Sequence, residues 1–266
     1  MRQLFAALCL LAALPLAAAE RVISLAPSLT DIVLELDASE RLVGVLDGGE
    51  RSPALAGLPS VGRYGQVNLE QLLSLRPDLL LVWPGSVPQA QLEKLKGFGI
   101  PMYVADPHRM QDISRQLAEM GELLGHGDQG RRLARSFDQR VADLRDQYRR
   151  ERPLRVFYQV WNRPLYTLGG RQVISDALQV CGAENLFADL ALPAPQVSTE
   201  SVLARDPDVI LGGSHAELDG WRDMPQLTAT RLGQLWPIPD KNLERPSYGM
   251  LEATEKLCRL LATARN

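Results

Sequence analysis

The side chains that most often carry catalysis or bind metals are sparse in this chain of 266 residues. The three histidines, His108, His126 and His215, lie far apart, and none stands at metal-ligand spacing to another histidine or to a cysteine. The sequence also lacks the GxxxxGK(S/T) and GxGxxG loops that bind phosphates. We therefore predict no catalytic residues, no metal site and no cofactor.

One short motif, GGSHA from Gly212 to Ala216, follows an apolar strand pattern and is similar to the nucleophile elbow of serine hydrolases. In that elbow a glycine stands two positions after the serine, whereas this chain has Ala216 there. The usual order of serine, acid and histidine also fails, because no histidine follows His215. We interpret the turn as a glycine-rich strand exit lining a cleft, with a serine hydrolase as the less favoured alternative.

Two glutamates occupy equivalent places in an internal repeat. The run NLEQLLSLRPDLLL from Asn68 aligns without a gap to STESVLARDPDVIL from Ser198, so that Glu70 falls on Glu200. Each half predicts a capped short helix, a Pro-Asp pair and an apolar strand. For either glutamate alone, a favourable interaction with the helix dipole is a sufficient explanation. As a symmetric pair of surface anions, however, they suit two basic sites on a partner.

Several aromatic side chains lie at or near predicted strand ends, where they can stack on a flat ligand and still offer N–H or O–H groups. They are Tyr64, Trp83, Trp161, Tyr166 and Tyr248. Packing in the core or at its rim is the alternative for each of them. We favour packing for Tyr166, which lies inside a strand-like run, and ligand contact for Trp83, which Pro84-Gly85 follows at once.

The elements that must position these groups alternate between strand and helix. Strand patterns occupy residues 21–25, 41–45, 79–83, 102–105, 154–160 and 209–211. Helical patterns occupy residues 68–75, 89–98, 110–124, 171–180, 198–205 and 247–264, and a further helix opens at Pro27-Ser28 with Ser28 as its predicted N-cap. Residues 47–50 and 61–66 are predicted loops. This alternation predicts parallel sheets covered on both faces, with ligands bound outside the carboxyl ends of the strands.

A long helix over residues 128–150 separates two such α/β halves. Its apolar positions recur at helical spacing and are Leu133, Phe137, Val141, Leu144 and Tyr148. Asp128 is its predicted N-cap, and Pro153 cannot continue it. At 1.5 Å per residue it would be about 34 Å long, roughly the width of a small domain. We predict two Rossmann-like α/β lobes joined by this rigid helix, with the ligand cleft between the lobes.

The chain begins with the pattern of an export signal. Arg2 precedes an apolar run over residues 4–16, and residues 17–19 (AAA) fit a cleavage site before Glu20. The run is too short to span a bilayer, and Cys9 lacks the preceding Gly or Ala of a lipoprotein signal. We therefore predict a soluble exported protein. Its predicted parts are a signal peptide 1–19, an N-terminal lobe 20–126, a connecting helix 127–152 and a C-terminal lobe 153–266.

Charge and cysteine content narrow the function further. A net charge of −3 supplies no basic excess to neutralise phosphates, so we predict no nucleic-acid partner. Removal of the signal leaves Cys181 and Cys258, which are disulfide candidates in an oxidising compartment. Two buried free thiols are the alternative. A bridge would tie the last helix back into the second half.

Segments spread over nearly the whole mature chain resemble the periplasmic binding proteins of ABC importers for cobalamin, ferric siderophores and haem. They are RVISLAPSLTDI, RLVGV, LPSVG, NLEQLLSLRPDLLLVW and STESVLARDPDVIL. The runs RVFYQV, VCGAENLF, PQVSTESVLAR and LERPS are most similar to the cobalamin-binding members. The resemblance implies two α/β lobes on a rigid helix with little closure. It also implies a periplasmic, non-enzymatic and monomeric carrier that passes cobalamin or a related corrinoid to a membrane permease.

The resemblance also assigns roles to particular positions. Glu70 and Glu200 match two glutamates that dock onto permease arginines, and Cys181 and Cys258 match a disulfide. The loops that hold the ligand match Pro27, Ser28, Asp47, Gly48, Tyr64, Gly65, Gln66, Trp83, Trp161, Asn242, Leu243, Glu244 and Arg245.

Some aromatic positions of the cobalamin-binding members are missing here. Gly48 stands for a tyrosine, Ala194 for a tryptophan, and Asn242-Leu243 for an aromatic pair. Trp161 and Tyr248 are candidates to compensate for them. A ferric siderophore or haem is therefore the alternative ligand of the same fold. The candidate contacts for those ligands are Arg63, Tyr64 and His215.

Overall fold

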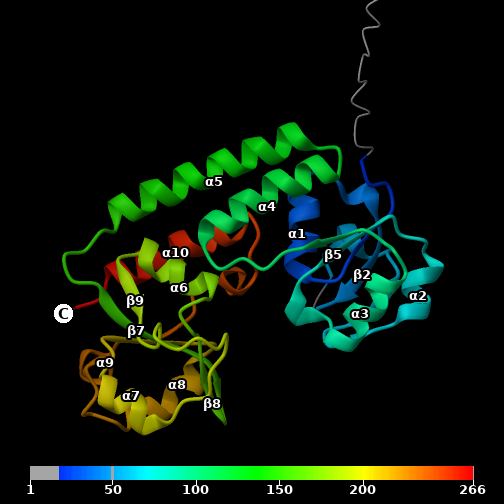
Figure 1. Cartoon of the computed structure of the whole chain (residues 1–266). Helices are drawn as coiled ribbons and strands as arrows, with labels where there is room; N and C mark the ends of the chain where they lie inside the picture. The colour runs from blue at the N-terminus through cyan, green and yellow to red at the C-terminus, as the bar shows by residue number, and fades with distance from the viewer. Residues whose placement is uncertain (1–17, 49–50, 266) are drawn as a thin grey trace, which may run out of the picture.

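The computed structural model of the chain describes residues 18–48 and 51–265 (Figure 1). Most of the predicted signal peptide, residues 1–17, and Gly49 and Glu50 of a predicted loop lie outside the described residues. Two α/β lobes stand on the same side of a pair of long antiparallel helices, α4 (Met110–Leu123) and α5 (Gly127–Gln147). Within the described chain, no helix has the length and apolar character to cross a bilayer.

The N-terminal lobe contains a sheet of six strands in the order β4-β3-β2-β1-β5-β6. The strands are β1 (Val22–Ser24), β2 (Leu42–Asp47), β3 (Ser60–Arg63), β4 (Gln66–Val67), β5 (Leu79–Val82) and β6 (Met102–Val104). All neighbours are parallel except β3 and β4. The helices are α1 (Pro27–Glu35), α2 (Leu69–Ser74) and α3 (Gln89–Gly97), with short 3-10 turns η1 (Ser39–Arg41), η2 (Pro53–Leu55) and η3 (Pro84–Ser86).

The C-terminal lobe repeats this plan around β7, which pairs with β8, β9 and β10. Its strands are β7 (Leu154–Asn162), β8 (Leu165–Thr167), β9 (Ala183–Asn185), β10 (Val209–Gly212) and β11 (Leu235–Pro237), and only β8 runs antiparallel to its neighbour. Its helices are α6 (Val173–Val180), α7 (Thr199–Arg205), α8 (His215–Arg222), α9 (Thr228–Leu232), η4 (Lys241–Glu244) and α10 (Met250–Ala262). The predicted fold class is confirmed.

The internal repeat is confirmed at the level of single hydrogen bonds. Asn68 caps α2 by accepting from the backbone N–H of Gln71 at 3.1 Å, and Ser198 caps α7 by accepting from Ser201 at 3.2 Å. The residue before the Pro-Asp pair has a positive φ in both lobes, 46° at Arg76 and 44° at Asp206. The two helix-to-strand turns are therefore built alike.

The Pro-Asp pairs hold the first strand of each lobe. The carboxylate of Asp78 accepts from the N–H of Arg21 at 3.0 Å, and that of Asp208 accepts from the N–H of Arg155 at 2.8 Å. The guanidinium of each arginine then donates to the last carbonyls of α2 or α7. Orphan carbonyls at these helix ends thereby gain partners.

Several local predictions were wrong for identifiable reasons. Ser28 is not the N-cap of α1, because Pro27 occupies the first helical position and Ala26 is the capping residue. Asp128 lies inside the first turn of α5, where its carboxylate pairs with Arg131 instead of capping. The predicted loop 61–66 contains a β3–β4 hairpin, and β9, β11, α8 and α9 were not predicted.

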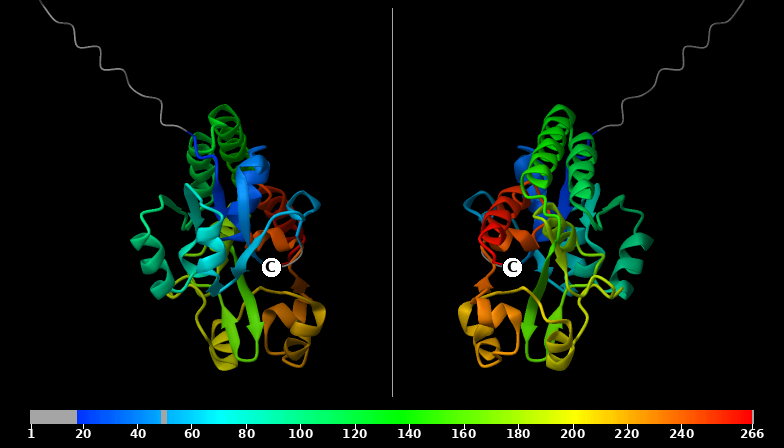
Figure 2. Two further views of the ribbon diagram at one scale, coloured as in Figure 1. Left: turned by 90° about the vertical axis from the view of Figure 1, so that its right-hand side faces the viewer. Right: turned by 90° about the vertical axis from the view of Figure 1, so that its left-hand side faces the viewer.

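The two lobes are joined by more than one segment. After β6 the chain reaches the C-terminal lobe, where the N–H of Met110 donates to the Asp176 carboxylate at 2.8 Å. Helix α4 then returns to the N-terminal lobe, and α5 crosses again (Figure 1), and seen from either end of the molecule the two helices lie side by side at the top (Figure 2). One apolar core runs from α1 beneath both long helices into α6 and α10. The long connecting helix is confirmed, with α4 packed along it, and it ends at Gln147, short of residue 152.

Two glycines set the distance between α4 and α5. A Cβ on Gly130 would lie 2.5 Å from the Leu117 carbonyl oxygen and 3.0 Å from Cα of Gly121. Both neighbours are backbone atoms, so the helices would have to move apart. We expect Gly130→Ala to lower the free energy of unfolding by about 2 kcal/mol through overpacking, despite the better helix propensity of alanine.

Urea denaturation of the mature protein checks this expectation. Gly97→Ala is the matched control, because it also lies in a helix but a Cβ there meets nothing within 4 Å. An equal effect of both substitutions would contradict the role given to the glycine contact.

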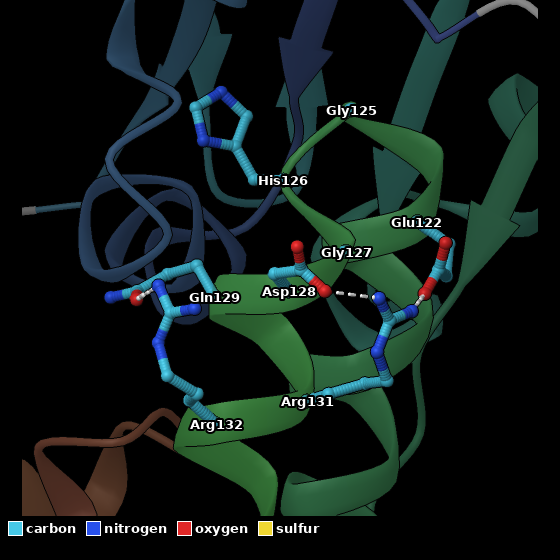
Figure 3. A pocket seen from close by; sticks show the side chains of 8 residues that line it. All are labelled: Glu122, Gly125, His126, Gly127, Asp128, Gln129, Arg131 and Arg132. Atoms are coloured by element: carbon cyan, nitrogen blue, oxygen red, sulfur yellow. Dashed lines mark hydrogen bonds and ion pairs between the residues drawn. The ribbon is translucent and has the colours of Figure 1, made fainter.

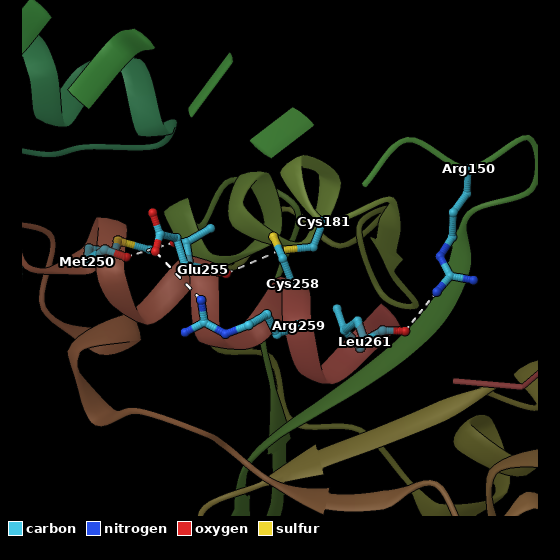
Figure 4. The surroundings of a disulfide bond; sticks show 8 residues. Arg150, Cys181, Met250, Glu255, Cys258, Arg259 and Leu261 are labelled. Atoms are coloured by element: carbon cyan, nitrogen blue, oxygen red, sulfur yellow. Dashed lines mark hydrogen bonds and ion pairs between the residues drawn. A yellow bond between two sulfur atoms is a disulfide. The ribbon is translucent and has the colours of Figure 1, made fainter. Parts of the chain in front are cut away.

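The final helix is bonded covalently to the residue that caps the C-terminus of α6. Cys181 and Cys258 form a disulfide with Cα atoms 4.6 Å apart, so the bridge is confirmed and the free-thiol alternative is wrong (Figure 4). Both residues are buried in the core. Beyond the bridge, the Arg150 guanidinium donates to the Leu261 carbonyl at 2.8 Å, and Glu255 pairs with Arg140 of α5.

Candidate functional site

The segment that follows β1 contacts the segment that follows β11 and η4 across the lobe boundary. Pro27 follows β1 in the N-terminal lobe, and Arg245 follows β11 in the C-terminal lobe. The guanidinium of Arg245, at the C-terminal end of η4, donates to the Pro27 carbonyl at 3.3 Å and so joins the start of α1 to the end of η4. Parallel strands place their carboxyl ends at one edge of a sheet, so the other predicted loops of each lobe lie along the same two edges.

On the N-terminal lobe, Tyr64 and Trp83 form an aromatic pair with ring centroids 6.1 Å apart. Tyr64 lies at the turn of the β3–β4 hairpin and is 59 % exposed, whereas Trp83 follows β5 and is half-buried. The N–H of Gly65 donates to the Ser86 carbonyl at 3.0 Å, which fastens the hairpin turn to η3 beside Trp83. Two aromatic surfaces are thereby held next to each other at this edge.

Asp47 and Gly48, at the end of β2, are engaged with their own lobe. The Asp47 carboxylate accepts from Ser60 Oγ at 2.5 Å and from Arg51 Nε at 2.8 Å. These bonds, the one from Ser60 first, hold the pKa of Asp47 below its usual range. A Cβ on Gly48 would lie 2.1 Å from Cγ of Pro27, so this backbone has no room for a tyrosine unless Pro27 moves.

On the C-terminal lobe, Trp161 near the end of β7 is 59 % exposed, and its indole N–H donates to the Arg163 carbonyl at 3.0 Å. The β7–β8 hairpin that carries it borders a hollow of about 260 Å³. Leu165, Trp221 and Met224 are apolar groups of its lining, and Thr199 at the start of α7 also borders it.

The predicted residues around η4 are divided between surface and core. Asn242 is exposed, but Leu243 is fully buried in the core and presents no surface to a ligand. Glu244 accepts from the hydroxyl of the buried Tyr158 at 3.2 Å. The Arg245 guanidinium is held by Asp31, with Nε–Oδ2 at 2.6 Å and Nη2–Oδ1 at 2.7 Å. Glu244 and Arg245 therefore already have protein partners.

The remaining predicted ligand residues lie at the rim. Pro27 and Ser28 are half-buried at the start of α1, and Gln66 is exposed, with its amide oxygen 3.3 Å from Arg63 Nε. Tyr166, for which packing was favoured, is half-buried and pairs with Gln196 through an isolated bridge.

The serine of the GGSHA motif has a structural task. Ser214 is the N-cap of α8, and its hydroxyl accepts from the Glu217 backbone N–H at 3.3 Å. His215 begins the helix. Across the described ranges 18–48 and 51–265, no group of three or more His, Cys, Asp and Glu side chains is arranged to hold a metal ion.

A second hollow of about 410 Å³ lies at the turn between α4 and α5, far along the chain from the predicted loops (Figure 3). Arg131 points between Glu122 and Asp128 and pairs with both, and Arg132 donates to Gln129 at 2.7 Å. His126 lies 3.3 Å from Glu40 on η1. Both carboxylates of this hollow, those of Glu122 and Asp128, are thus paired with Arg131.

Glu70 and Glu200 occupy the first turns of α2 and α7, and both are exposed. Hydrogen bonds from the Glu200 backbone N–H and from Ser198 lower the pKa of Glu200. The carboxylate is therefore ionised at neutral pH, and the two anions stand at equivalent places on the two lobes.

Two acidic residues at the lobe boundary were missed. Asp31 holds Arg245, and the Glu35 carboxylate accepts from the backbone N–H groups of Tyr248 and Gly249, each at 2.8 Å. Burial raises the pKa of Glu35, although both N–H bonds oppose the shift. Their spacing of four residues on α1 was a signal for one helix face, but nothing in the sequence indicated partners more than 210 residues away.

Comparison with known proteins places the chain in a family. The model of the periplasmic binding protein family matches residues 22–231. The vitamin B12-binding protein of Yersinia pestis is 36 % identical over 257 residues, which cover 94 % of this chain and 89 % of that protein. The crystal structure of the periplasmic vitamin B12 binding protein of Vibrio cholerae has a TM-score of 0.84 at 34 % identity and covers 92 % of this chain and 97 % of its own.

A periplasmic haem-binding protein of Vibrio cholerae shares the fold alone, with a TM-score of 0.76 at 22 % identity over 91 % of this chain and 98 % of its own. The matched family model spans most of the chain, and the relatives cover nearly all of the described residues. The chain belongs to the periplasmic binding protein family.

Proposed function

We propose that this protein captures cobalamin or a related corrinoid between its lobes and delivers it to the permease of an ABC importer. The observation that carries the proposal is the presence of aromatic side chains at strand ends of both lobes. They are Tyr64 and Trp83 on one lobe and Trp161 on the other. The names of relatives that are 34–36 % identical support a corrinoid ligand. A corrin ring is flat and large, so exposed rings on two facing lobes suit it.

The proposed contacts are non-covalent. Tyr64, Trp83 and Trp161 would stack on the ligand, while Gln66 and Asn242 would offer amide hydrogen bonds from the exposed rim. Pro27, Ser28, Asp47, Gly48 and Gly65 would shape the edge, and Glu244 and Arg245 would act mainly through their protein partners. Leu243 would support the loop from the core. Neither a cofactor nor a catalytic residue belongs to this proposal.

Location and assembly form part of the same proposal. The chain would be exported to the periplasm, cleaved after Ala19, and act as a monomer with an N-terminal lobe 20–126, a connecting helix 127–152 and a C-terminal lobe 153–266. Glu70 and Glu200, one exposed on each lobe, would dock onto basic residues of the permease. Their equivalent positions suit a partner that presents two similar surfaces.

Calorimetric titration of the mature, ligand-free protein tests the ligand. We expect cyanocobalamin to bind with one-to-one stoichiometry, and haem and a ferric hydroxamate to give no saturable heat in parallel titrations. Binding of haem or the ferric hydroxamate instead of cobalamin would indicate a role in haem or iron uptake. Arg63, Tyr64 and His215 would then be the contacts to test first.

Trp83→Ala is expected to weaken cyanocobalamin binding by about 10- to 100-fold, since loss of a stacked aromatic removes a large apolar contact. The same titration measures this, with circular dichroism to show that the fold persists. Phe98→Ala is the control, because Phe98 is a 50 % exposed aromatic residue at the C-terminal end of α3 that belongs to none of the proposed contacts, and it should leave the affinity unchanged. An unchanged affinity in Trp83→Ala would place the ligand away from the Tyr64–Trp83 pair.

A further inference from the structure

The lobes are bonded to each other at a place that the connecting helices do not form. Asp31 and Glu35 lie one turn apart on α1 of the N-terminal lobe. They accept hydrogen bonds from the segment between η4 and α10 of the C-terminal lobe. Arg245 donates to Asp31, and the backbone N–H groups of Tyr248 and Gly249 donate to Glu35. We name these five residues the interlobe clasp.

The contact between Asp31 and Arg245 is the strong, directional kind. Both guanidinium–carboxylate bonds are short, 2.6 and 2.7 Å, and form a two-pronged fork. The side chains are 34 % and 25 % exposed for Arg245 and Asp31, so the pair is partly shielded from water. Since Arg245 also donates to the Pro27 carbonyl, the fork fixes the start of α1, where the predicted ligand loop begins.

Glu35 supplies hydrogen-bond acceptors at the N-terminus of the last helix, α10. The N-terminus of α10 has no side-chain cap of its own. The Glu35 carboxylate accepts from the N–H groups of Tyr248 and Gly249 with one oxygen each, both at 2.8 Å, and the Ser247 hydroxyl shares the Gly249 N–H at the longer distance of 3.2 Å. A carboxylate of one lobe therefore satisfies donors at the beginning of a helix of the other lobe, where it also meets the positive end of the helix dipole.

The C-terminal side of the clasp is itself held firmly. Glu244 is bonded to the buried Tyr158, Leu243 lies in the core, and Asp240 pairs with Lys256 of α10 at 2.7 Å. Tyr248 also contacts α5, with its hydroxyl 3.0 Å from Ser136 Oγ. The segment that carries Arg245, Tyr248 and Gly249 is therefore fixed to its own lobe. Movement of one lobe relative to the other would stretch the hydrogen bonds of the clasp.

We infer that Asp31 and Glu35 are positioning residues whose clasp on Arg245, Tyr248 and Gly249 holds the two lobes at one separation, so that the edges that bind the ligand are preformed. The expected effect on corrinoid affinity rests on the proposed function, whereas the existence of the clasp does not. A ligand that needs the aromatic groups of both lobes binds more weakly when only part of the population has the correct spacing.

Distances between two spin labels, one on each lobe, test the clasp without any ligand. Ala90→Cys on α3 and Ala204→Cys on α7 provide exposed label positions. The native Cys181 and Cys258 are joined in the disulfide and do not take a label. We expect one narrow distance distribution in the otherwise wild-type mature protein, and a clearly broader or shifted one in Asp31→Asn and in Glu35→Gln.

Two further variants separate the clasp from a general loss of stability. Asp189→Asn is the matched control, because Asp189 makes the same kind of fork with Arg205, at 2.6 and 2.9 Å, but within the C-terminal lobe. It should leave the distribution unchanged. Arg245→Lys keeps the charge but loses the fork, so we expect an intermediate width. Distributions in Asp31→Asn and Glu35→Gln as narrow as that of Asp189→Asn would overturn the inference.

The affinity for cyanocobalamin is the second readout. We expect Asp31→Asn and Glu35→Gln to weaken it by roughly three- to tenfold, in step with the loss of the correct spacing, and Asp189→Asn to leave it unchanged. If the wild-type protein does not bind cobalamin, the proposed function fails, while the label distances still decide the clasp. Weaker binding with unchanged distances would make these residues direct ligand contacts and refute the positioning role.

Discussion

Joint replacement of Cys181 and Cys258 by alanine is expected to lower the free energy of unfolding by about 4 kcal/mol. The bridge joins residues 77 positions apart and so removes a large loop-closure entropy from the unfolded chain. It also fastens α10, which supplies a buried face to the core and is bonded to Glu35 at its N-cap, Gly249. Loss of the two buried sulfur atoms adds a cavity cost in the same direction.

Urea denaturation of the mature protein measures this loss. A reducing agent should destabilise the wild-type protein by a similar amount and leave the double alanine variant unaffected, which makes reduction an internal control. A difference below about 1 kcal/mol would mean that the bridge constrains little that the core does not already hold.

Glu70→Ala combined with Glu200→Ala is expected to weaken binding to the permease by about 100-fold and to leave the affinity for cyanocobalamin unchanged. Each truncation removes one charge pair across the proposed interface, worth about tenfold, and the two sites are on different lobes, so that their effects should add. Both carboxylates are exposed, and neither lies among the proposed ligand contacts. The loss should be smaller at high salt, where the wild-type interaction is itself screened.

Binding to the permease in detergent or nanodiscs, followed by surface plasmon resonance, gives the measurement. Asp138→Ala combined with Asp146→Ala on α5 makes the same change in net charge at exposed positions of the connecting helix, and it should bind like wild type. An equal loss in both double variants would show that only the net charge matters. A loss of cobalamin affinity in the glutamate variant would contradict a docking role.

The parts of the fold that could be predicted from the sequence are those with a local cause. β5 is a run of four buried residues and was recognised because a strand covered on both faces is apolar throughout. The repeat placed Glu70 and Glu200 alike, since a capping residue and a Pro-Asp pair leave a pattern within a few positions. The long helix was recognised by one apolar stripe along otherwise charged turns.

The features that escaped prediction depend on distant partners or on backbone torsion. The β3–β4 hairpin needs Gly62 at a φ of 124° and Gly65 at 76°, and glycines by themselves indicated only a loop. Leu243 and Arg245 fell within a motif taken as ligand-binding, yet one is buried in the core and the other holds Asp31 across the lobe boundary. No local pattern reports such contacts.

The crossing of the lobe boundary by α4 and α5 together has a mechanical meaning. Domains rotate easily about a hinge when the segments that connect them are short and irregular. Here two continuous helices connect the lobes, and their backbones are in contact at Gly121 and Gly130. Bending there would break hydrogen bonds in both helices. The two helices therefore oppose rotation about such a hinge, while the clasp sets the separation of the binding edges. With both in place, a ligand that binds between the lobes surrenders little conformational entropy from the protein.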